Sequence, residues 1–208
     1  MGKITRVHER ALTADSNESL LAVYDDWAEG YDHDLMQDWG YSTPTRVVEC
    51  LCQYLSQPDP LVLDAGCGTG LVGEALARAG VGRAEGIDFS RAMLAQAADK
   101  GVYRQLHCLD MNETLPLADG CYDGVTCVGT FTTAHVRPDA LRELVRVTRP
   151  GGVLSFSVRK EYWQATDFRA LVTAMDAAGQ VILEELRTEA YVESEGSRCK
   201  LVVLRVPD

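Results

Sequence analysis

A strand-like apolar run that leads straight into a glycine-rich turn constrains the fold of this chain more than any other feature. Residues 61–71 read LVLDAGCGTGL, in which the apolar run ends at Asp64 and glycines follow at every second position, as Gly66, Gly68 and Gly70. Such a turn gives up side chains and loses more conformational entropy on folding than an ordinary turn. We therefore expect that something comes very close to its backbone, directly after a strand.

Strand and helix signals alternate from this turn onward. The strand-like segments are near-continuous apolar runs, which are typical of strands buried on both faces of a parallel sheet. Predicted strands cover 61–65, 83–88, 103–109, 121–129 and 151–159, and predicted helices cover 71–79, 90–99, 137–148 and 164–178. Two last strand-like segments, 180–191 and 198–206, are joined by a link too short for a helical crossover, so they should pair antiparallel. The pattern predicts an α/β sandwich closed by a hairpin.

The residues before this core predict two helices. Aromatic and apolar side chains fall on one face of a helix within residues 17–35. They are Leu20, Tyr24, Trp27 and Tyr31. A second helix is expected to start with Thr43 as its capping residue and Pro44 at the first helical position. We expect a single domain with a loose lead at 1–16, N-terminal helices at 17–56 and the core at 61–208.

The charge balance limits the partners that this chain can have. It carries 20 basic and 31 acidic residues, a formal net charge of -11. Binding to a nucleic-acid backbone needs a dense basic surface, so no nucleic-acid partner is expected. An acidic chain suits a cationic ligand better.

Apolar runs and cysteines point to an intracellular protein. No apolar run reaches the roughly 18 residues that a membrane span needs, and no export signal is visible, so no membrane association is expected. The seven cysteines are expected to be free thiols in a reducing compartment, with the cytoplasm as the default and the nucleus as an alternative. Cys50 and Cys52 lack a second ligand pair, so no metal site is predicted.

Aspartates end three successive predicted strands, at Asp64, Asp88 and Asp110. In open parallel sheets, ligands bind beyond the carboxyl ends of the strands. The carboxylate of Asp88 can accept both hydroxyl hydrogens of a ribose. Its alternative role is to cap the next helix, but Ser90 is already placed for that. Asp110 can accept from an adenine amino group, while the neighbouring Met111 taken alone is equally a core residue.

With these residues, the chain resembles the class I S-adenosylmethionine-dependent methyltransferases. The resemblance covers roughly residues 20–206 and is carried by VLDAGCGTG, EGIDFS, LDMNETLPLADGCYDGV and RVTRPGGVL. It implies S-adenosylmethionine as cofactor and a three-layer, Rossmann-like sandwich whose seven-stranded, mostly parallel sheet ends in an antiparallel hairpin. The segment YDDWAEGYD at 24–32 resembles the helix that closes over the cofactor, which makes 17–56 the lid helices.

The resemblance also implies roles for individual residues. The glycine turn would lie against the methionine part of the cofactor, with Asp64 supporting the turn, and Asp88 would hold the ribose. Backbone at the end of the fourth strand would face the sulfonium, and Tyr31 would close over the cofactor. Tyr24 and Trp27 are further lid candidates, although the helical face that they share with Tyr31 is equally typical of a core face. The full set of expected cofactor residues is Tyr31, Asp64, Gly66, Cys67, Gly68, Gly70, Asp88, Phe89, Asp110, Met111, Val128, Gly129 and Thr130.

No catalytic residue can be assigned from the sequence. Methyl transfer needs alignment of the reactants, and a base only where the nucleophile must lose a proton. The segment VGTFTTAH lacks the Asn- or Asp-Pro-Pro-aromatic motif of exocyclic-amine enzymes, which argues against adenine-N6 or glutamine acceptors. His135 is a candidate base, although a lone histidine entering a helix is more often structural. Other candidates for contact with a substrate, from their places at segment ends alone, are His33, Arg159, Tyr162 and Trp163.

The leading hypothesis is a monomeric S-adenosylmethionine-dependent methyltransferase that acts on a small molecule or an otherwise unidentified acceptor. An alternative is a catalytically silent S-adenosylmethionine-binding protein that acts through a partner, because no catalytic signature lies beyond the cofactor motifs. A nicotinamide-dependent oxidoreductase is disfavoured, since the third glycine comes one residue earlier than in the dinucleotide fingerprint and the chain closes with a hairpin.

Overall fold

A single seven-stranded sheet forms the centre of the computed structural model, which describes residues 10–11, 13–14, 16–35, 40–132 and 136–208. The strand order is β3-β2-β1-β4-β5-β7-β6. The strands are β1 (Leu61–Ala65), β2 (Arg83–Asp88), β3 (Gln105–Cys108), β4 (Tyr122–Phe131), β5 (Thr148–Arg159), β6 (Ile182–Ala190) and β7 (Arg198–Arg205). The first five strands pair in parallel, and β7 is antiparallel to both β5 and β6. The predicted α/β sandwich with its antiparallel hairpin is confirmed.

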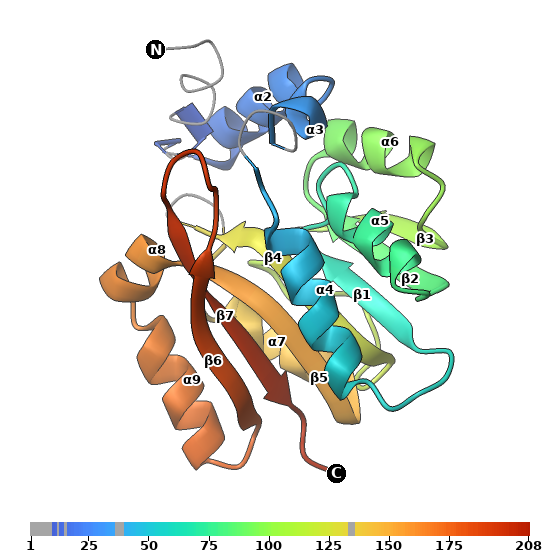
Figure 1. Cartoon of the computed structure of the whole chain (residues 1–208), viewed down its shortest axis with the longest axis vertical. Coiled ribbons are helices and arrows are strands. Elements are labelled where there is room, and N and C mark those ends of the chain that lie inside the picture. The colour runs from blue at the N-terminus through green and yellow to red at the C-terminus, as the bar shows by residue number, and fades with distance from the viewer. Residues whose placement is uncertain (1–9, 12, 15, 36–39, 133–135) are drawn as a thin grey trace.

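Helices cover both faces of this sheet (Figure 1). They are α2 (Asn17–Trp27), α3 (Tyr31–His33), α4 (Thr43–Tyr54), α5 (Leu71–Arg78), α6 (Arg91–Asp99), α7 (Ala140–Val147), α8 (Lys160–Ala165) and α9 (Phe168–Ala177). Leu51 of α4 and Leu76 of α5 belong to the buried cluster on one face, while Leu141 of α7 and Phe168 of α9 belong to the cluster on the other. The helices α2 and α3 lie beyond one end of the strands, at the top of Figure 1.

The strand order places a switch point at the middle of the sheet. After β1 the chain adds β2 and β3 on one side, and it then returns to add β4 on the other side of β1. Where the strand order reverses in this way, the connections after the two neighbouring strands leave in opposite directions. A crevice then opens beyond the carboxyl ends of those two strands. The glycine turn after β1 and the last residues of β4 therefore border the same crevice.

Several predicted boundaries were wrong because tertiary contacts override local signals. The predicted helix 164–178 is two helices, since Thr166 takes an extended conformation and its hydroxyl donates to Tyr162 O at 2.8 Å. The predicted helix 17–35 is likewise broken between Trp27 and Tyr31. Thr43 is not a cap but the first helical residue, and its buried hydroxyl donates to Tyr191 O at 3.1 Å.

The strand predictions differ from the structure mainly at their ends. The predictions for β1 and β2 are confirmed residue by residue, whereas β3 is shorter than predicted and β4 and β5 are longer at one end. Tyr103 lies before β3 because its side chain turns inward, where it donates to Asp64. A buried hydrogen bond thus replaces the continuation of the edge strand.

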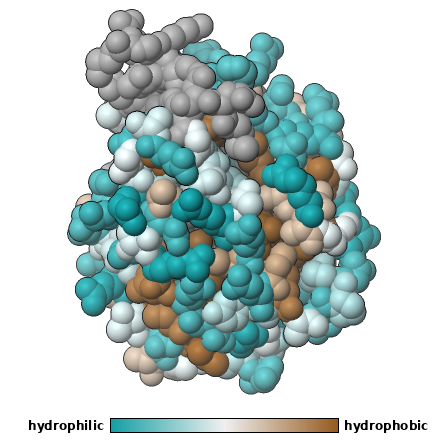
Figure 2. All heavy atoms as spheres, viewed as in Figure 1, coloured by the Kyte–Doolittle hydropathy of each residue, from teal (hydrophilic) through white to brown (hydrophobic). Residues whose placement is uncertain are grey.

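Hydrophilic residues dominate the face of the molecule shown in Figure 2, with smaller areas of hydrophobic atoms among them. The edge strand β6 exposes two large apolar side chains, Ile182 and Leu186. Within the described ranges, every helix is too short or too polar to cross a lipid bilayer.

Candidate functional site

A cavity lies beyond the carboxyl ends of β1, β2, β3 and β4. It encloses roughly 670 Å³ of empty space, including its open mouth. Its walls come from α2 and α3, the glycine turn, the ends of the strands and the start of α6. The lining residues are Leu20, Tyr24, Tyr31, Gly66, Gly68, Asp88, Phe89, Met93, Leu109, Asp110, Met111, Asn112, Val128, Gly129, Thr130 and Val136.

Most of the residues expected from the sequence meet in this one cavity. Those that line it are Tyr31, Gly66, Gly68, Asp88, Phe89, Asp110, Met111, Val128, Gly129 and Thr130. Asp64, Cys67 and Gly70 are not among the lining residues. The sequence reasoning gave no site role to Leu20, Met93, Leu109, Asn112 and Val136. Leu20 shares the helical face of Tyr24 and Tyr31, and Leu109 and Asn112 lie inside the motif at 109–125, so these three had a signal that could have found them.

Two glycines of the turn are required for different steric reasons, one for packing against β4 and the other for open space at the cavity. All three glycines have positive φ, between +52° and +96°. A Cβ on Gly66 would overlap Thr130 Oγ1 and lie 2.9 Å from Thr130 Cγ2, so this glycine lets the turn pack against the end of β4. A Cβ on Gly68 would meet no atom within 4 Å, so this glycine keeps the cavity open.

The carboxylate of Asp88 is the central polar group of the cavity. Its Oδ2 accepts the N–H of Gly68 and its Oδ1 accepts the N–H of Ser90, both at 2.9 Å. Burial raises the pKa of Asp88, and these backbone hydrogen bonds oppose the rise. Each oxygen of a carboxylate can accept more than one hydrogen bond, so this group retains acceptor capacity toward the cavity. The predicted cap by Ser90 is confirmed, since Ser90 Oγ accepts the N–H of Met93 at 3.2 Å.

Asp64 lies behind the glycine turn and is fully buried. It accepts hydrogen bonds from the hydroxyls of Tyr103 at 2.6 Å and Thr126 at 3.1 Å. Burial raises the pKa of Asp64 to about 7, and the two hydrogen bonds limit the rise. The Tyr103 hydroxyl also accepts the N–H of Gly73 at 3.0 Å, so Asp64 supports the first turn of α5 through Tyr103.

The three lid candidates have different surroundings. Tyr24 and Tyr31 line the cavity, with ring centroids 6.2 Å apart, and Tyr24 also meets Phe89 edge to face at 6.4 Å. Trp27 is buried against Tyr31, and its Nε1 donates to Asp34 Oδ2 at 2.8 Å. Two aromatic rings therefore face the cavity, and the third packs behind them.

A hydrogen bond ties α3 to the glycine turn, and an ion pair ties α3 to the end of α6. Asp32 accepts a short hydrogen bond from the Thr69 hydroxyl and pairs with Lys100 Nζ at 2.5 Å. Lys100 also pairs with Glu74 of α5 at 2.9 Å, and its side chain is only 17% exposed. We call Asp32, Thr69, Lys100 and Glu74 the lid contact. No spacing in the sequence predicts it, because its members come from four separate segments.

The residues considered for substrate contact lie around the cavity without lining it. The Tyr162 hydroxyl donates at 2.8 Å to the carbonyl oxygen of Val136, which does line the cavity. The guanidinium carbon of Arg159 is 5.3 Å from the ring centroid of Tyr191, and Trp163 stacks on Phe168. His33 is largely exposed. His135 is outside the described residues.

Comparison with known proteins agrees with the features of this site. The profile of the family described as "Methyltransferase domain" matches residues 63–156. Methyltransferase-like protein 27 of Homo sapiens is 35% identical over 185 residues, which make up 86% of this chain and 75% of that protein. A malonyl-[acyl-carrier protein] O-methyltransferase of Pectobacterium atrosepticum is 41% identical over 103 residues, which make up 46% of this chain and 37% of that enzyme.

Solved structures show the same fold at low sequence identity. A SAM-dependent methyltransferase from Thermotoga maritima has a TM-score of 0.63 and 19% identity, with 90% of this chain and 99% of that chain covered. Among the relatives matched by sequence, this chain spans three quarters of the length of the human protein but less than half of the length of the Pectobacterium atrosepticum enzyme.

Proposed function

The chain belongs to the class I S-adenosylmethionine-dependent methyltransferases, and from this membership we propose that it methylates a small molecule, or an acceptor group presented by a larger partner, at the mouth of the described cavity. The observation that carries this proposal is the buried carboxylate of Asp88, held by two backbone N–H groups beside a glycine that leaves the cavity open.

The cavity residues fit the parts of S-adenosylmethionine. The remaining acceptor capacity of Asp88 suits the two hydroxyls of the ribose. Phe89 and Met111 offer apolar surface for the adenine ring, and Asp110 offers an acceptor for its amino group. The open space beside Gly68 allows the methionine part to approach the backbone. Asp64, Cys67 and Gly70 would act from behind the turn.

Two aromatic faces suit the cationic end of the cofactor. Tyr24 and Tyr31 both line the cavity, and a cation over an aromatic ring gains about 0.5–1 kcal/mol at an exposed site and more when water is excluded. Burial raises the pKa of both hydroxyls well above the ordinary value, so both stay protonated and are able to donate a hydrogen bond to a ligand.

When bound, S-adenosylmethionine supplies an electrophilic methyl group on its sulfonium. The protein's own task is to align the acceptor with that methyl group and to exclude water, and alignment alone can be worth an effective concentration of about 10⁵ M or more. The described lining residues include no histidine, lysine or cysteine. The two lining carboxylates, Asp88 and Asp110, are assigned above to the ribose and the adenine ring, so we propose an acceptor whose nucleophile is already free of its proton or has an available lone pair.

Calorimetric titration with S-adenosylmethionine, with S-adenosylhomocysteine and with NAD tests the site. We expect micromolar binding of the first two and none of NAD. The change Asp88→Ala should abolish binding, while Asp99→Ala, on the exposed end of α6, should leave it unchanged. Equal affinity of the Asp88→Ala variant and the wild type would refute this assignment. Conversion of S-adenosylmethionine to S-adenosylhomocysteine in the presence of candidate acceptors then tests the transfer itself.

We also propose that the enzyme works as a monomer in the cytoplasm. All seven cysteines are free thiols, which suits a reducing compartment. A sedimentation measurement of the molecular mass tests the monomer.

A further inference from the structure

A second, wide groove lies between α8, α9 and β7, outside the cavity. It encloses about 1490 Å³ of empty space, including its open mouth. Trp163, itself buried, contributes to its floor, and Ala170, Ala174 and Ala177 place small side chains along one face of α9. These small side chains allow a bound chain to approach the helix closely.

The groove is basic on an acidic protein. Lys160, Arg169 and Lys200 line it with one carboxylate, Asp167, so its local charge is three minus one, or +2, against -11 for the whole chain. Across the described part of the chain, none of these three cations takes part in an ion pair. Lys200 Nζ donates to the Thr188 hydroxyl at 2.7 Å. The groove thus holds uncompensated positive charge that can meet an anionic partner.

The groove adjoins the cavity through α8. This helix starts directly after β5, and its Tyr162 hydroxyl holds the carbonyl oxygen of Val136, a residue of the cavity wall. Lys160, in the first turn of the same helix, lines the groove. A segment bound in the groove would therefore lie one helix away from the cavity mouth.

We propose that this groove docks an acidic segment of a partner protein that presents the methyl acceptor to the cavity. The proposal rests on the proposed methyl transfer and names the kind of partner. The small size of the basic area favours a short acidic segment over nucleic acid. An extended polyanion such as nucleic acid would also meet the surrounding acidic surface and be repelled by it. A short acidic segment can be held by a local charge of +2 while the rest of its protein stays clear.

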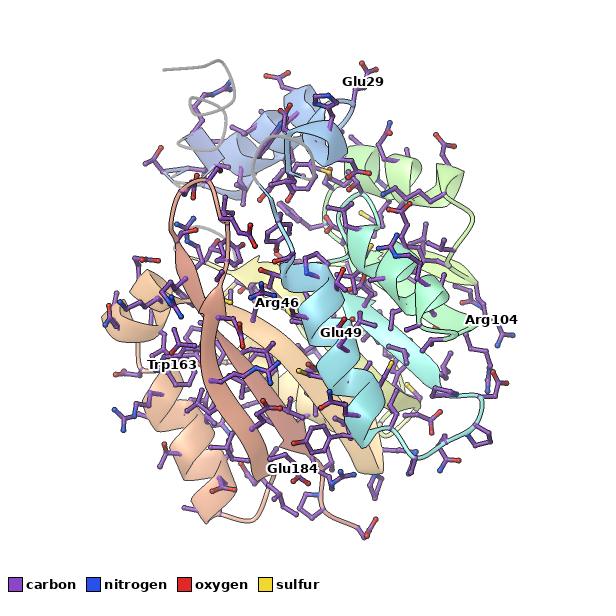
Figure 3. All side chains as sticks on the ribbon, in the orientation of Figure 1. Glu29, Arg46, Glu49, Arg104, Trp163 and Glu184 are labelled. Carbon is purple, nitrogen blue, oxygen red and sulfur yellow. The ribbon has the colours of Figure 1, made fainter. Side chains whose placement is uncertain are left out.

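Fluorescence anisotropy of a labelled oligoglutamate peptide with the full chain tests this docking. The double variant Lys160→Glu/Arg169→Glu reverses two groove charges near helix N-termini, where a carboxylate is well tolerated. The control Arg78→Glu/Arg104→Glu reverses two exposed cations elsewhere, and Figure 3 shows Arg104 on the opposite side of the view from Trp163. Both variants are also titrated with S-adenosylmethionine.

We expect salt-sensitive binding of the peptide and a loss of at least about fivefold in the groove variant, because each reversal replaces an attraction by a repulsion. The control should change by less than about twofold, because its two charges lie away from the groove. Affinity for S-adenosylmethionine should be unchanged in both. The docking proposal is overturned by a wild type that does not bind the peptide, or by equal losses in both variants. Tighter, groove-dependent binding of oligothymidylate or of phosphatidylserine vesicles would also overturn it. Failure of the wild type to bind S-adenosylmethionine would instead refute the proposed function and leave the peptide contrast standing.

Discussion

Two glycines of the turn should respond in opposite ways to the same substitution. In Gly66→Ala the new methyl group overlaps the side chain of Thr130, whereas in Gly68→Ala it points into the open cavity. Both positions have positive φ, +75° and +52°, so both variants carry the backbone strain of an L-residue in the left-handed region. Gly179, at the end of α9, has a φ of +68° and no atom within 4 Å of a built Cβ, so Gly179→Ala measures that strain alone.

The expected losses of unfolding free energy follow from these contacts. Left-handed strain costs about 1–2 kcal/mol, which is the whole effect expected for Gly68→Ala and Gly179→Ala. Overpacking adds about 1–3 kcal/mol in Gly66→Ala, for a total of about 2–5 kcal/mol. Conversely, the methyl group of Gly68→Ala occupies ligand space, and a clash of about 1–3 kcal/mol weakens S-adenosylmethionine binding by roughly 5- to 150-fold.

Urea unfolding and calorimetric titration of the three variants separate these effects. The double variant Gly66→Ala/Thr130→Ala should recover part of the stability lost in Gly66→Ala, because the overlapping Oγ1 and Cγ2 atoms are gone. The steric argument fails if Gly66→Ala is as stable as Gly179→Ala. The placement of the ligand beside Gly68 fails if Gly68→Ala binds S-adenosylmethionine as tightly as the wild type does.

Three further changes test the surroundings of the cavity. Asp88→Asn keeps the shape of the side chain but loses its charge, and we expect calorimetry to show about a tenfold or greater loss of S-adenosylmethionine affinity, since charge-assisted hydrogen bonds contribute about 1.5–3 kcal/mol. For Asp64, the pKa in the folded state is about 7, above the ordinary value of 3.8, so the folded state binds the proton more tightly than the unfolded state does. The free energy of unfolding therefore falls as the pH rises from 4 to 7, by up to about 4 kcal/mol at 1.36 kcal/mol per pH unit. Urea unfolding at pH 5 and pH 8 should show this fall in the wild type, and a fall of the same size in Asp64→Asn would contradict the assignment. Lys100→Ala leaves Asp32 and Glu74 without their shared cation, so the lid contact should restrain α3 less. Release of S-adenosylmethionine, measured by stopped flow, should then become about two- to fivefold faster, while the control Arg104→Ala should leave the rate unchanged.

Local sequence predicted the parts of the fold whose signals are local. The bounds of β1 follow from a short apolar run before the glycine turn, those of β2 from a segment that ends at Asp88, and the cap of α6 from Ser90 alone. Predictions went wrong where a distant partner competes for the chain. Tyr103 leaves the edge strand because Asp64 accepts its hydroxyl, and Thr43 enters α4 because the backbone of Tyr191 accepts its hydroxyl.

The candidate site divides in the same way. Gly66, Gly68, Asp88 and Asp110 could be named in advance, because strands of a parallel sheet bring their carboxyl ends to one edge and each of these residues ends or follows a strand. Other lining residues, such as Met93 and Val136, carry no pattern that separates them from ordinary neighbours.

The sequence by itself determined the alternation of strands and helices, the closing hairpin and the edge of the sheet at which the cavity lies, because these depend on hydrophobic periodicity and on residues next to each other in the chain. Only the tertiary structure decided that Asp64 accepts the Tyr103 hydroxyl, that Asp32 reaches Thr69 and Lys100, and that three cations with no ion-pair partner among the described residues gather between α8, α9 and β7. Those outcomes depend on contacts between segments far apart in sequence, whose distances are set by the packing of the whole core.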